Sequence, residues 1–303
     1  LNGFFCFDHL YQKPGEEFLK EWKTFISLPL FKETNYSPFC FDVSAYHNLG
    51  ANSVTELAYF ILQVNEYLNF AEQNKISLGN KEIVIMVSVG NNFFESVAKL
   101  RALRKLFSLL TKQYGLKNPL YLYCKNSLVN KSTLDIHNNL LRSTTEGMAA
   151  VIGGANSLSL FPFNDAVKEN DPEGLRWARN QQIIFKEEAA LNKVADMSAG
   201  SYYIETLTRQ LAENAWKIFQ AIESEGGFIA CIKNGFIPEL IAAMANKQKV
   251  DFAAGKKILV GVNKFSNEKE KVFSRLAEKI SSINLILSAE TESAVAAKKK
   301  EHA

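Results

Sequence analysis

Ile83-Val84-Ile85-Met86-Val87-Ser88-Val89 is a nearly unbroken apolar run, and a long amphipathic segment begins shortly after it. Such a run is typical of a strand that is covered on both faces, as in a parallel sheet. In the segment at residues 93–114, Leu100 and Leu103 belong to a stripe of apolar residues at helical spacing, which predicts a helix with one buried side. A buried strand followed by an amphipathic helix is the repeating unit of α/β folds.

The same unit recurs on both sides of this run. Strand candidates lie at residues 3–7, 39–45, 83–89, 120–124 and 157–161, and helical patterns lie at residues 16–27, 53–74, 93–114, 138–152 and 174–192. Because the strands begin at intervals of roughly forty residues, the spacing predicts about five consecutive βα units. Periodicity alone fits either a segment of an eight-stranded barrel or an open doubly wound sheet.

The composition is that of a globular protein. The chain has 303 residues, of which 47% are hydrophobic, and its net charge of +3 is spread over mixed-sign helices, so no basic footprint for nucleic acid is present. No apolar run approaches the roughly eighteen residues of a membrane span, and the apolar start lacks the basic flank of a secretory signal. We therefore expect no nucleic-acid or membrane partner. The four cysteines lack the close spacing of zinc or redox sites, so we expect free thiols in a reducing compartment.

Many segments resemble, in chain order, the barrel domain of methylmalonyl-CoA mutases. They are Ala45-Tyr46-His47-Asn48 with Gly50-Ala51, Asn92-Phe93-Phe94-Glu95, Ala98-Lys99-Leu100-Arg101-Ala102-Leu103-Arg104, Asn138-Asn139-Leu140-Leu141-Arg142-Ser143-Thr144-Thr145-Glu146, Gly153-Gly154, Arg176-Trp177-Ala178-Arg179-Asn180-Gln181-Gln182, Gly200-Ser201-Tyr202-Tyr203-Ile204-Glu205, Glu225-Gly226-Gly227 and Gly261-Val262-Asn263-Lys264-Phe265. The resemblance runs from about residue 37 to residue 265. It implies an isomerase that interconverts methylmalonyl-CoA and succinyl-CoA with adenosylcobalamin.

The resemblance favours the barrel over the doubly wound sheet, because the matching segments occur in barrel order. Five strands do not close an eight-stranded barrel and would leave two apolar edges. We therefore expect an α/β fold of the (β/α)8 TIM-barrel family with only about the last five βα units present, the chain starting in mid-barrel. The expected division is a barrel part at residues 1–197, a helical extension at 198–265 that wraps the barrel, and a charged tail or linker at 266–303.

His47 is the candidate catalytic residue. It follows the predicted strand at residues 39–45 and precedes Gly50-Ala51, which places it at the carboxyl end of a strand, where active sites of this fold lie. The resemblance implies that its imidazole reaches the thioester carbonyl of the substrate and donates a hydrogen bond or a proton. The alternative is a structural role, in which His47 fixes its loop by a hydrogen bond to a backbone carbonyl.

His137 nearly completes a cobalt-binding signature. Asp135-Ile136-His137-Asn138-Asn139 resembles the Asp-x-His-x-x-Gly motif of cobalamin-dependent mutases, but Leu140 stands where glycine is expected. The segment aligns with the start of a barrel helix, for which Asp135 is a candidate N-cap. We therefore expect no cofactor-binding or metal-binding residue in this chain.

Two departures from the catalytic members of the family indicate a role without turnover. Tyr123-Cys124-Lys125-Asn126-Ser127-Leu128 stands where catalytic members carry His-Cys-Gln-Thr-Ser-Gly, and Glu82 stands where they tend to carry an arginine suited to CoA phosphates. The chain is thus most similar to the small, non-cobalamin-binding subunit of the heterodimeric bacterial enzyme. That likeness implies a cytoplasmic protein of propionate metabolism whose partner, the catalytic large subunit, carries adenosylcobalamin and meets the acyl-CoA substrate.

Two alternatives stay open. The first is that the chain is a fragment of a catalytically competent acyl-CoA mutase, and it predicts that His47 lines an open, substrate-sized cavity. A structural subunit should instead have a blocked or altered barrel mouth. The other alternative is a degenerate fragment that does not fold by itself, which would melt without cooperativity.

Overall fold

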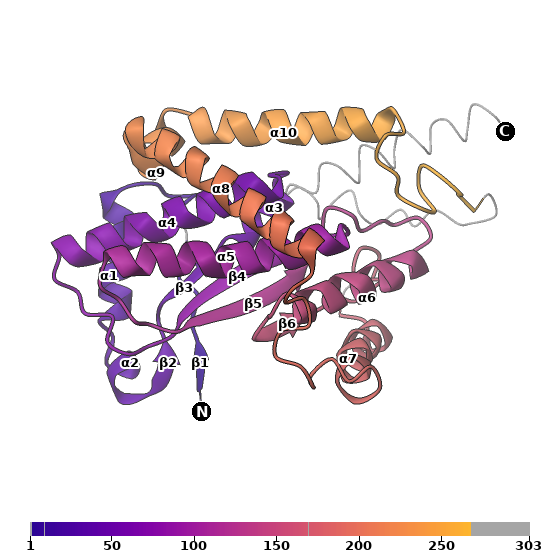
Figure 1. Cartoon of the computed structure of the whole chain (residues 1–303), viewed down its shortest axis with the longest axis horizontal. Coiled ribbons are helices and arrows are strands. Elements are labelled where there is room, and N and C mark those ends of the chain that lie inside the picture. The colour runs from indigo at the N-terminus through magenta and orange to yellow at the C-terminus, as the bar shows by residue number, and fades with distance from the viewer. Residues whose placement is uncertain (1, 9, 169, 268–303) are drawn as a thin grey trace.

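The computed structural model describes residues 2–8, 10–168 and 170–267. Its strands are β1 (Asn2–Phe4), β2 (Asn35–Ser37), β3 (Cys40–Asp42), β4 (Ile83–Val89), β5 (Leu120–Asn126) and β6 (Ser157–Ser159). Its helices are α1 (Glu16–Ile26), α2 (Pro29–Glu33), α3 (Ser44–Asn48), α4 (Ser53–Gln73), α5 (Phe93–Gln113), α6 (His137–Ile152), α7 (Pro172–Glu187), α8 (Tyr202–Ser224), α9 (Gly227–Lys233) and α10 (Phe236–Ala253) (Figure 1).

Every strand pair is parallel, which confirms the α/β class. β1 pairs with β2, and β3, β4, β5 and β6 form a second sheet in the order in which they occur in the chain. A doubly wound sheet reverses its strand order at a switch point, and no reversal occurs within this four-stranded sheet. The order within this sheet is therefore that of consecutive βα units.

The strands also curl toward one face. The ring of Phe4 on β1 lies 5.6 Å from the ring of Tyr123 and 6.3 Å from that of Tyr121, both on β5. β1 pairs with β2, and the two edges of β5 pair with β4 and β6, so β1 is not a neighbour of β5 and the rings meet only because the strands curl toward this face. The face that carries the three rings is therefore concave.

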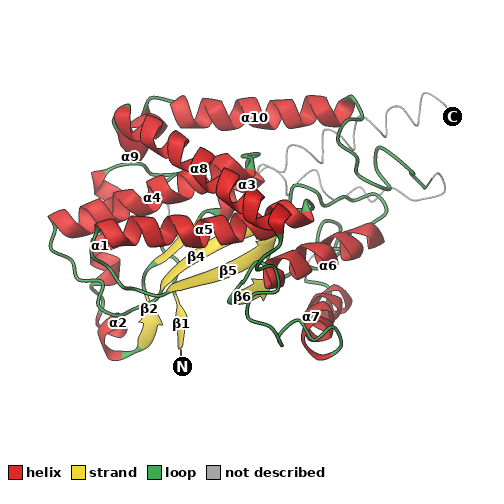
Figure 2. Cartoon of the chain, in the orientation of Figure 1, coloured by secondary structure: helices red, strands yellow, loops and turns green. Residues whose placement is uncertain are grey.

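The two faces of the sheet differ in character. Ile85, Val87 and Val89 of β4 join the main hydrophobic core, together with residues of α4 and α5. On the concave face, Tyr123 and Lys125 of β5 are only partly buried in the region that the structure describes. The expectation that the strands are covered on both faces thus holds for β4, in which six of seven residues are buried, and is wrong for β5 and β6. Figure 2 shows the helices α4, α5 and α8 stacked on one side of the sheet.

The predicted strand at residues 39–45 is shorter than expected. It ends at Asp42, because the carboxylate of Asp42 accepts hydrogen bonds from the backbone N–H and the hydroxyl of Ser44, at 3.0 and 2.5 Å, and turns the chain into α3. Near the end of the described residues, a single isolated bridge joins Val260 and Lys264. Neither β2 nor the short helices α2, α3 and α9 were predicted.

Helix boundaries agree with the predictions to within a few residues, with two informative exceptions. Asp171 caps α7 by accepting from the backbone N–H of Gly174 at 3.2 Å, so the helix begins at Pro172. The helix ends at Glu187, five residues before the predicted end at residue 192. Asp135 is not the N-cap of α6. Ile136 occupies that position, and Asp135 adopts a positive φ of 46° and accepts from the side chain of Asn138 at 2.5 Å.

The C-terminal helices cover the outside of the sheet domain. α8 crosses α4 and α5, and α10 runs above them (Figure 1). Within the part of the chain that the structure describes, no single helix is long and apolar enough to cross a membrane; α9 and α10 reach that length and composition only as a pair bent by 71°. The predicted tail falls almost wholly outside the described residues.

Candidate functional site

His47 lies on α3, directly after β3, at the carboxyl end of the sheet as predicted. Its Nε2 atom is 2.8 Å from the hydroxyl oxygen of Ser127, which follows β5. Its Nδ1 atom is 3.6 Å from Oε2 of Glu56, near the start of α4. Both ring nitrogens therefore face side-chain oxygens of this chain. The alternative prediction, in which His47 bonds to a backbone carbonyl, does not agree with these contacts.

Glu56 is held by a buried lysine. The Nζ atom of Lys99 donates to Oε2 of Glu56 at 2.7 Å and to the backbone carbonyl of Ser88 at 2.6 Å. The side chains of Lys99 and Glu56 are 2% and 1% exposed, so this ion pair is shielded from water.

The ionisation of Glu56 follows from these contacts. Burial by itself raises the pKa of the carboxyl, but the charge of Lys99 and the contact with His47 outweigh burial and leave the pKa of Glu56 below its ordinary value. A carboxylate that is ionised and immobile thus stands beside the imidazole of His47.

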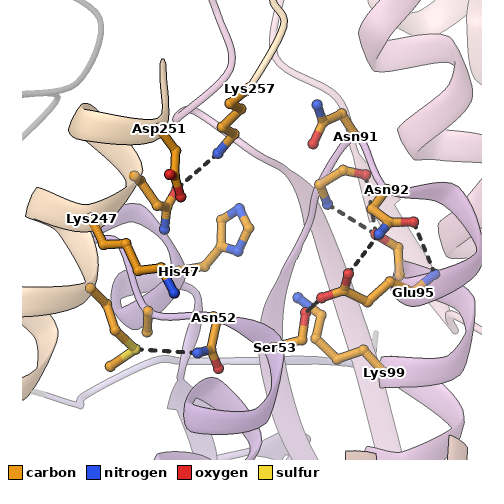
Figure 3. Close-up of a pocket in the computed structure, with 15 residues that line it drawn as sticks. His47, Asn52, Ser53, Asn91, Asn92, Glu95, Lys99, Lys247, Asp251 and Lys257 are labelled. Carbon is orange, nitrogen blue, oxygen red and sulfur yellow. Dashed lines mark hydrogen bonds between the residues drawn. The ribbon is translucent and has the colours of Figure 1, made fainter. Parts of the chain in front are cut away.

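A cavity of about 450 Å³ adjoins His47. Figure 3 shows the imidazole with Lys247 and Asp251 of α10 on one side, and Asn92 and Glu95 at the start of α5 on the other. Glu95 accepts hydrogen bonds from Ser53 at 2.5 Å and from the side chain of Asn92 at 2.6 Å, which ties the starts of α4 and α5 together. The volume falls within the range of small-molecule sites, and most of the residues that line the cavity are polar.

The backbone brings α10 close to this site. Gly50 has a φ of 105°, and a Cβ atom at this position would lie 2.7 Å from Cβ and 3.0 Å from Cα of Ala245. The side chain of Gln248 donates to the carbonyl of Gly50 at 2.8 Å. A glycine is therefore needed where α10 closes one wall of the cavity.

An ion pair spans the concave face of the sheet. Nζ of Lys125 lies 3.0 Å from Oδ2 of Asp42, on the other side of β4, and 3.4 Å from the hydroxyl of Ser44. The two charged side chains are 19% and 29% exposed. Lys125, which departs from the pattern of the catalytic members, thus pairs with Asp42 near the carboxyl ends of β5 and β3.

The remaining sequence candidates lie elsewhere. The ring of His137, the first residue of α6, stacks on Phe163 with 5.3 Å between ring centres, and His137 does not line the cavity beside His47. Glu82 is exposed and immediately precedes β4, so it lies at the opposite, amino end of the sheet from His47.

The sequence did not predict the partners of His47. Glu56, Lys99 and Ser127 come from α4, α5 and the end of β5, and only the fold brings them together. One signal was available, because Glu56 precedes the apolar run Leu57-Ala58-Tyr59-Phe60 and Lys99 lies between Ala98 and Leu100. Charged residues inside apolar helix segments are seldom buried unless they are paired.

A sequence model of the methylmalonyl-CoA mutase family matches residues 5–299. The chain belongs to the methylmalonyl-CoA mutase family. Among curated relatives, the methylmalonyl-CoA mutase small subunit of Porphyromonas gingivalis is 40% identical over 184 residues, which are 59% of this chain and 30% of that subunit. The likeness to a small subunit agrees with the prediction made from the departures at Lys125 and Glu82.

Longer alignments are found with other mutases of the family. The methylmalonyl-CoA mutase of Cereibacter sphaeroides is 34% identical over 236 residues, 75% of this chain and 33% of that protein. The human mitochondrial methylmalonyl-CoA mutase is 35% identical over 245 residues, 78% of this chain and 32% of that protein. The chain spans about a third of the length of the relatives it matches.

The described residues do not fit a cobalt-binding role. They include two histidines: the nitrogens of His47 face Ser127 and Glu56, and the ring of His137 is stacked on Phe163 away from the cavity. In the same part of the chain, no group of three or more His, Cys, Asp or Glu side chains could hold a metal ion. We therefore derive no chemical step through adenosylcobalamin on this chain.

Proposed function

We propose that this chain is part of the structural small subunit of an adenosylcobalamin-dependent methylmalonyl-CoA mutase. The observation that carries the proposal is the ion pair between Lys125 and Asp42. It places two charges on the concave face at the carboxyl end of the strands, where a barrel enzyme of this family would receive its substrate. An acyl group bound at this position would have to displace these two charged side chains.

The curled parallel sheet is, in this proposal, a segment of an eight-stranded barrel closed by further βα units. Residues 1–197 belong to the barrel, and residues 198–265 form the helical extension that covers it. The chain order of β3 to β6 and the contact between Phe4 and Tyr123 support this arrangement.

Turnover belongs, in the same proposal, to a large subunit that pairs with this one in a cytoplasmic heterodimer. That subunit binds adenosylcobalamin, which supplies radical chemistry when it is bound, and interconverts methylmalonyl-CoA and succinyl-CoA in propionate metabolism. The likeness to the Porphyromonas gingivalis small subunit supports the division of labour.

The catalytic alternative rests on the cavity of about 450 Å³ beside His47, which a competent mutase fragment was expected to have. Its polar lining, and the occupation of both imidazole nitrogens by Ser127 and Glu56, weigh against the alternative. His47 occupies the position of the family's catalytic histidine, and the turnover of a His47 variant tests whether it acts on the substrate.

The experiment uses the assembled enzyme, with the full-length subunit that contains this sequence. His47→Ala in this subunit should leave kcat and KM of the assembly within about twofold of the parent, with His137→Ala as the matched control. If His47 were a general acid, the same change should lower kcat by about 10²-fold or more. That outcome would reject the structural role.

A further inference from the structure

Ser127 is placed firmly beside the imidazole of His47. Its side chain is buried, and its backbone N–H donates to the carbonyl of Val89 at 2.8 Å, which fixes the chain where it leaves β5. The hydroxyl oxygen lies 2.8 Å from Nε2 of His47 and accepts from the backbone N–H of Val129 at 3.2 Å. The hydroxyl of Ser127 therefore sits between a fixed donor and the imidazole.

The direction of these hydrogen bonds sets the proton on the ring. A serine hydroxyl has one hydrogen to donate, and the backbone N–H of Val129 already points at one of its lone pairs. The hydrogen of the hydroxyl is then free to point at Nε2, while the second lone pair of the hydroxyl could instead accept from an Nε2–H, so the partner of Nδ1 decides which arrangement forms. A neutral imidazole whose Nε2 is an acceptor carries its proton on Nδ1.

The other side of the ring favours the same arrangement. Nδ1 faces Oε2 of Glu56 at 3.6 Å, slightly beyond hydrogen-bond length, and an anion at this distance attracts an N–H and repels a lone pair. Glu56 is kept in place by Lys99, whose ammonium is itself tied to the carbonyl of Ser88. The two sides of the imidazole thus impose one polarity.

We propose that Ser127 and Glu56 orient the imidazole of His47 with its proton on Nδ1, and that Nε2 accepts from the hydroxyl of Ser127. In this form Nε2 has no hydrogen to give, so the imidazole does not donate from that atom to a thioester carbonyl. Ser127 is then a positioning residue that acts through His47. The inference deepens the proposed function, since it gives a reason why the chain keeps a histidine at the family position without turnover.

The test is the tautomer itself, read by long-range ¹H–¹⁵N correlation NMR of the ring nitrogens in the full-length subunit, near neutral pH. The resonances of His47 are assigned as those lost in His47→Gln. We expect one nitrogen of His47 with the downfield shift of an unprotonated acceptor and ring couplings that identify it as Nε2. A spectrum with the proton on Nε2 overturns the proposal, and the parent protein alone suffices for this reading.

Variants test the cause. Ser127→Ala should raise the population protonated on Nε2 severalfold, Ser127→Thr should restore the parent pattern, and Glu56→Gln should shift the tautomers in the same direction as Ser127→Ala. Ser108→Ala, at an exposed serine of α5, is the matched control and should leave the spectrum unchanged. An unaltered tautomer in both Ser127→Ala and Glu56→Gln would contradict the assignment. Because this reading needs neither partner nor cofactor, it stands or falls separately from the measured turnover of the assembly.

Discussion

The Nζ atom of Lys99 lies 2.7 Å from Oε2 of Glu56, and almost nothing of either side chain is exposed to solvent. Removing only the lysine would leave a buried carboxylate without its counter-ion. We expect Lys99→Met to lower the free energy of unfolding by about 3–5 kcal/mol, measured by urea denaturation near pH 7.

The double variant Lys99→Met with Glu56→Gln is the matched control. It removes both charges, so it should recover most of the stability lost in the single variant, and with Glu56→Gln measured alone the cycle gives the coupling between the two positions. Equal losses in the single and double variants would mean that the pair is not coupled as the structure indicates.

The close approach of α10 to Gly50 gives a second prediction. Gly50→Ala combines a strained backbone at φ 105° with a contact of 3.0 Å to Cα of Ala245, so we expect a loss of about 2 kcal/mol or more. Hydrogen exchange should show faster opening of α10.

Gly79→Ala separates strain from contact. Gly79 also has a positive φ, of 56°, but nothing lies within 4 Å of a Cβ atom there. This variant should cost only about 1 kcal/mol and leave the exchange of α10 unchanged. If both glycine variants opened α10 equally, the contact would not be what holds the helix.

Asp8 makes stability depend on pH. Burial raises the pKa of Asp8 from its ordinary 3.8 to about 6, although the hydrogen bonds from Tyr67 and from the backbone of Asp42 act in the opposite direction. The folded state thus binds this proton more tightly than the unfolded state. The resulting stabilisation is full below pH 3.8, and it is lost as the pH rises to about 6.

The measurement compares the parent with Asp8→Asn, since other carboxyls titrate in both. The unfolding free energy of the parent, relative to that of Asp8→Asn, should fall by roughly 2 kcal/mol from pH 4 to pH 7. A difference that stays constant over this range would show that Asp8 titrates alike in both states.

The partly exposed ion pair between Lys125 and Asp42 should contribute little to the stability of the fold. Lys125→Gln should change the unfolding free energy by less than about 1 kcal/mol, because partly exposed pairs contribute little. Thermal unfolding of the two proteins checks this. A loss comparable to that of Lys99→Met would show that the pair between Lys125 and Asp42 stabilises the fold and is not kept for its place at the strand ends.

The elements that the sequence predicted well are those whose signal is local. The apolar run of β4 and the amphipathic patterns of α4 and α5 specify their own boundaries, and Asn52 and Asn92 cap the two helices by accepting from backbone amides. The short strand β2 and the shortened β3 were not predictable in this way. Their limits depend on pairing with β1 and β4 and on a side-chain turn at Asp42.

The site was predictable only in part. A histidine after a barrel-like strand indicates the carboxyl end of the sheet, and His47 is there. Its partner Ser127 lies 80 residues further along the chain. Lys99 contributes by pairing with Glu56, the other partner of the imidazole. Sequence spacing carries no information about such distant contacts, and the charged positions inside apolar helices were the only local sign of them.

The assignment to a structural subunit is tested most directly by locating adenosylcobalamin in the purified assembly. The full-length subunit is co-expressed with its large partner, the complex is isolated, and cobalamin is quantified on each separated subunit alongside turnover of each subunit alone. We expect a stable one-to-one complex in which the large subunit alone retains cobalamin, and no turnover from the small subunit alone. Cobalamin retained by the subunit that contains His47, or mutase turnover by that subunit in isolation, would contradict the account.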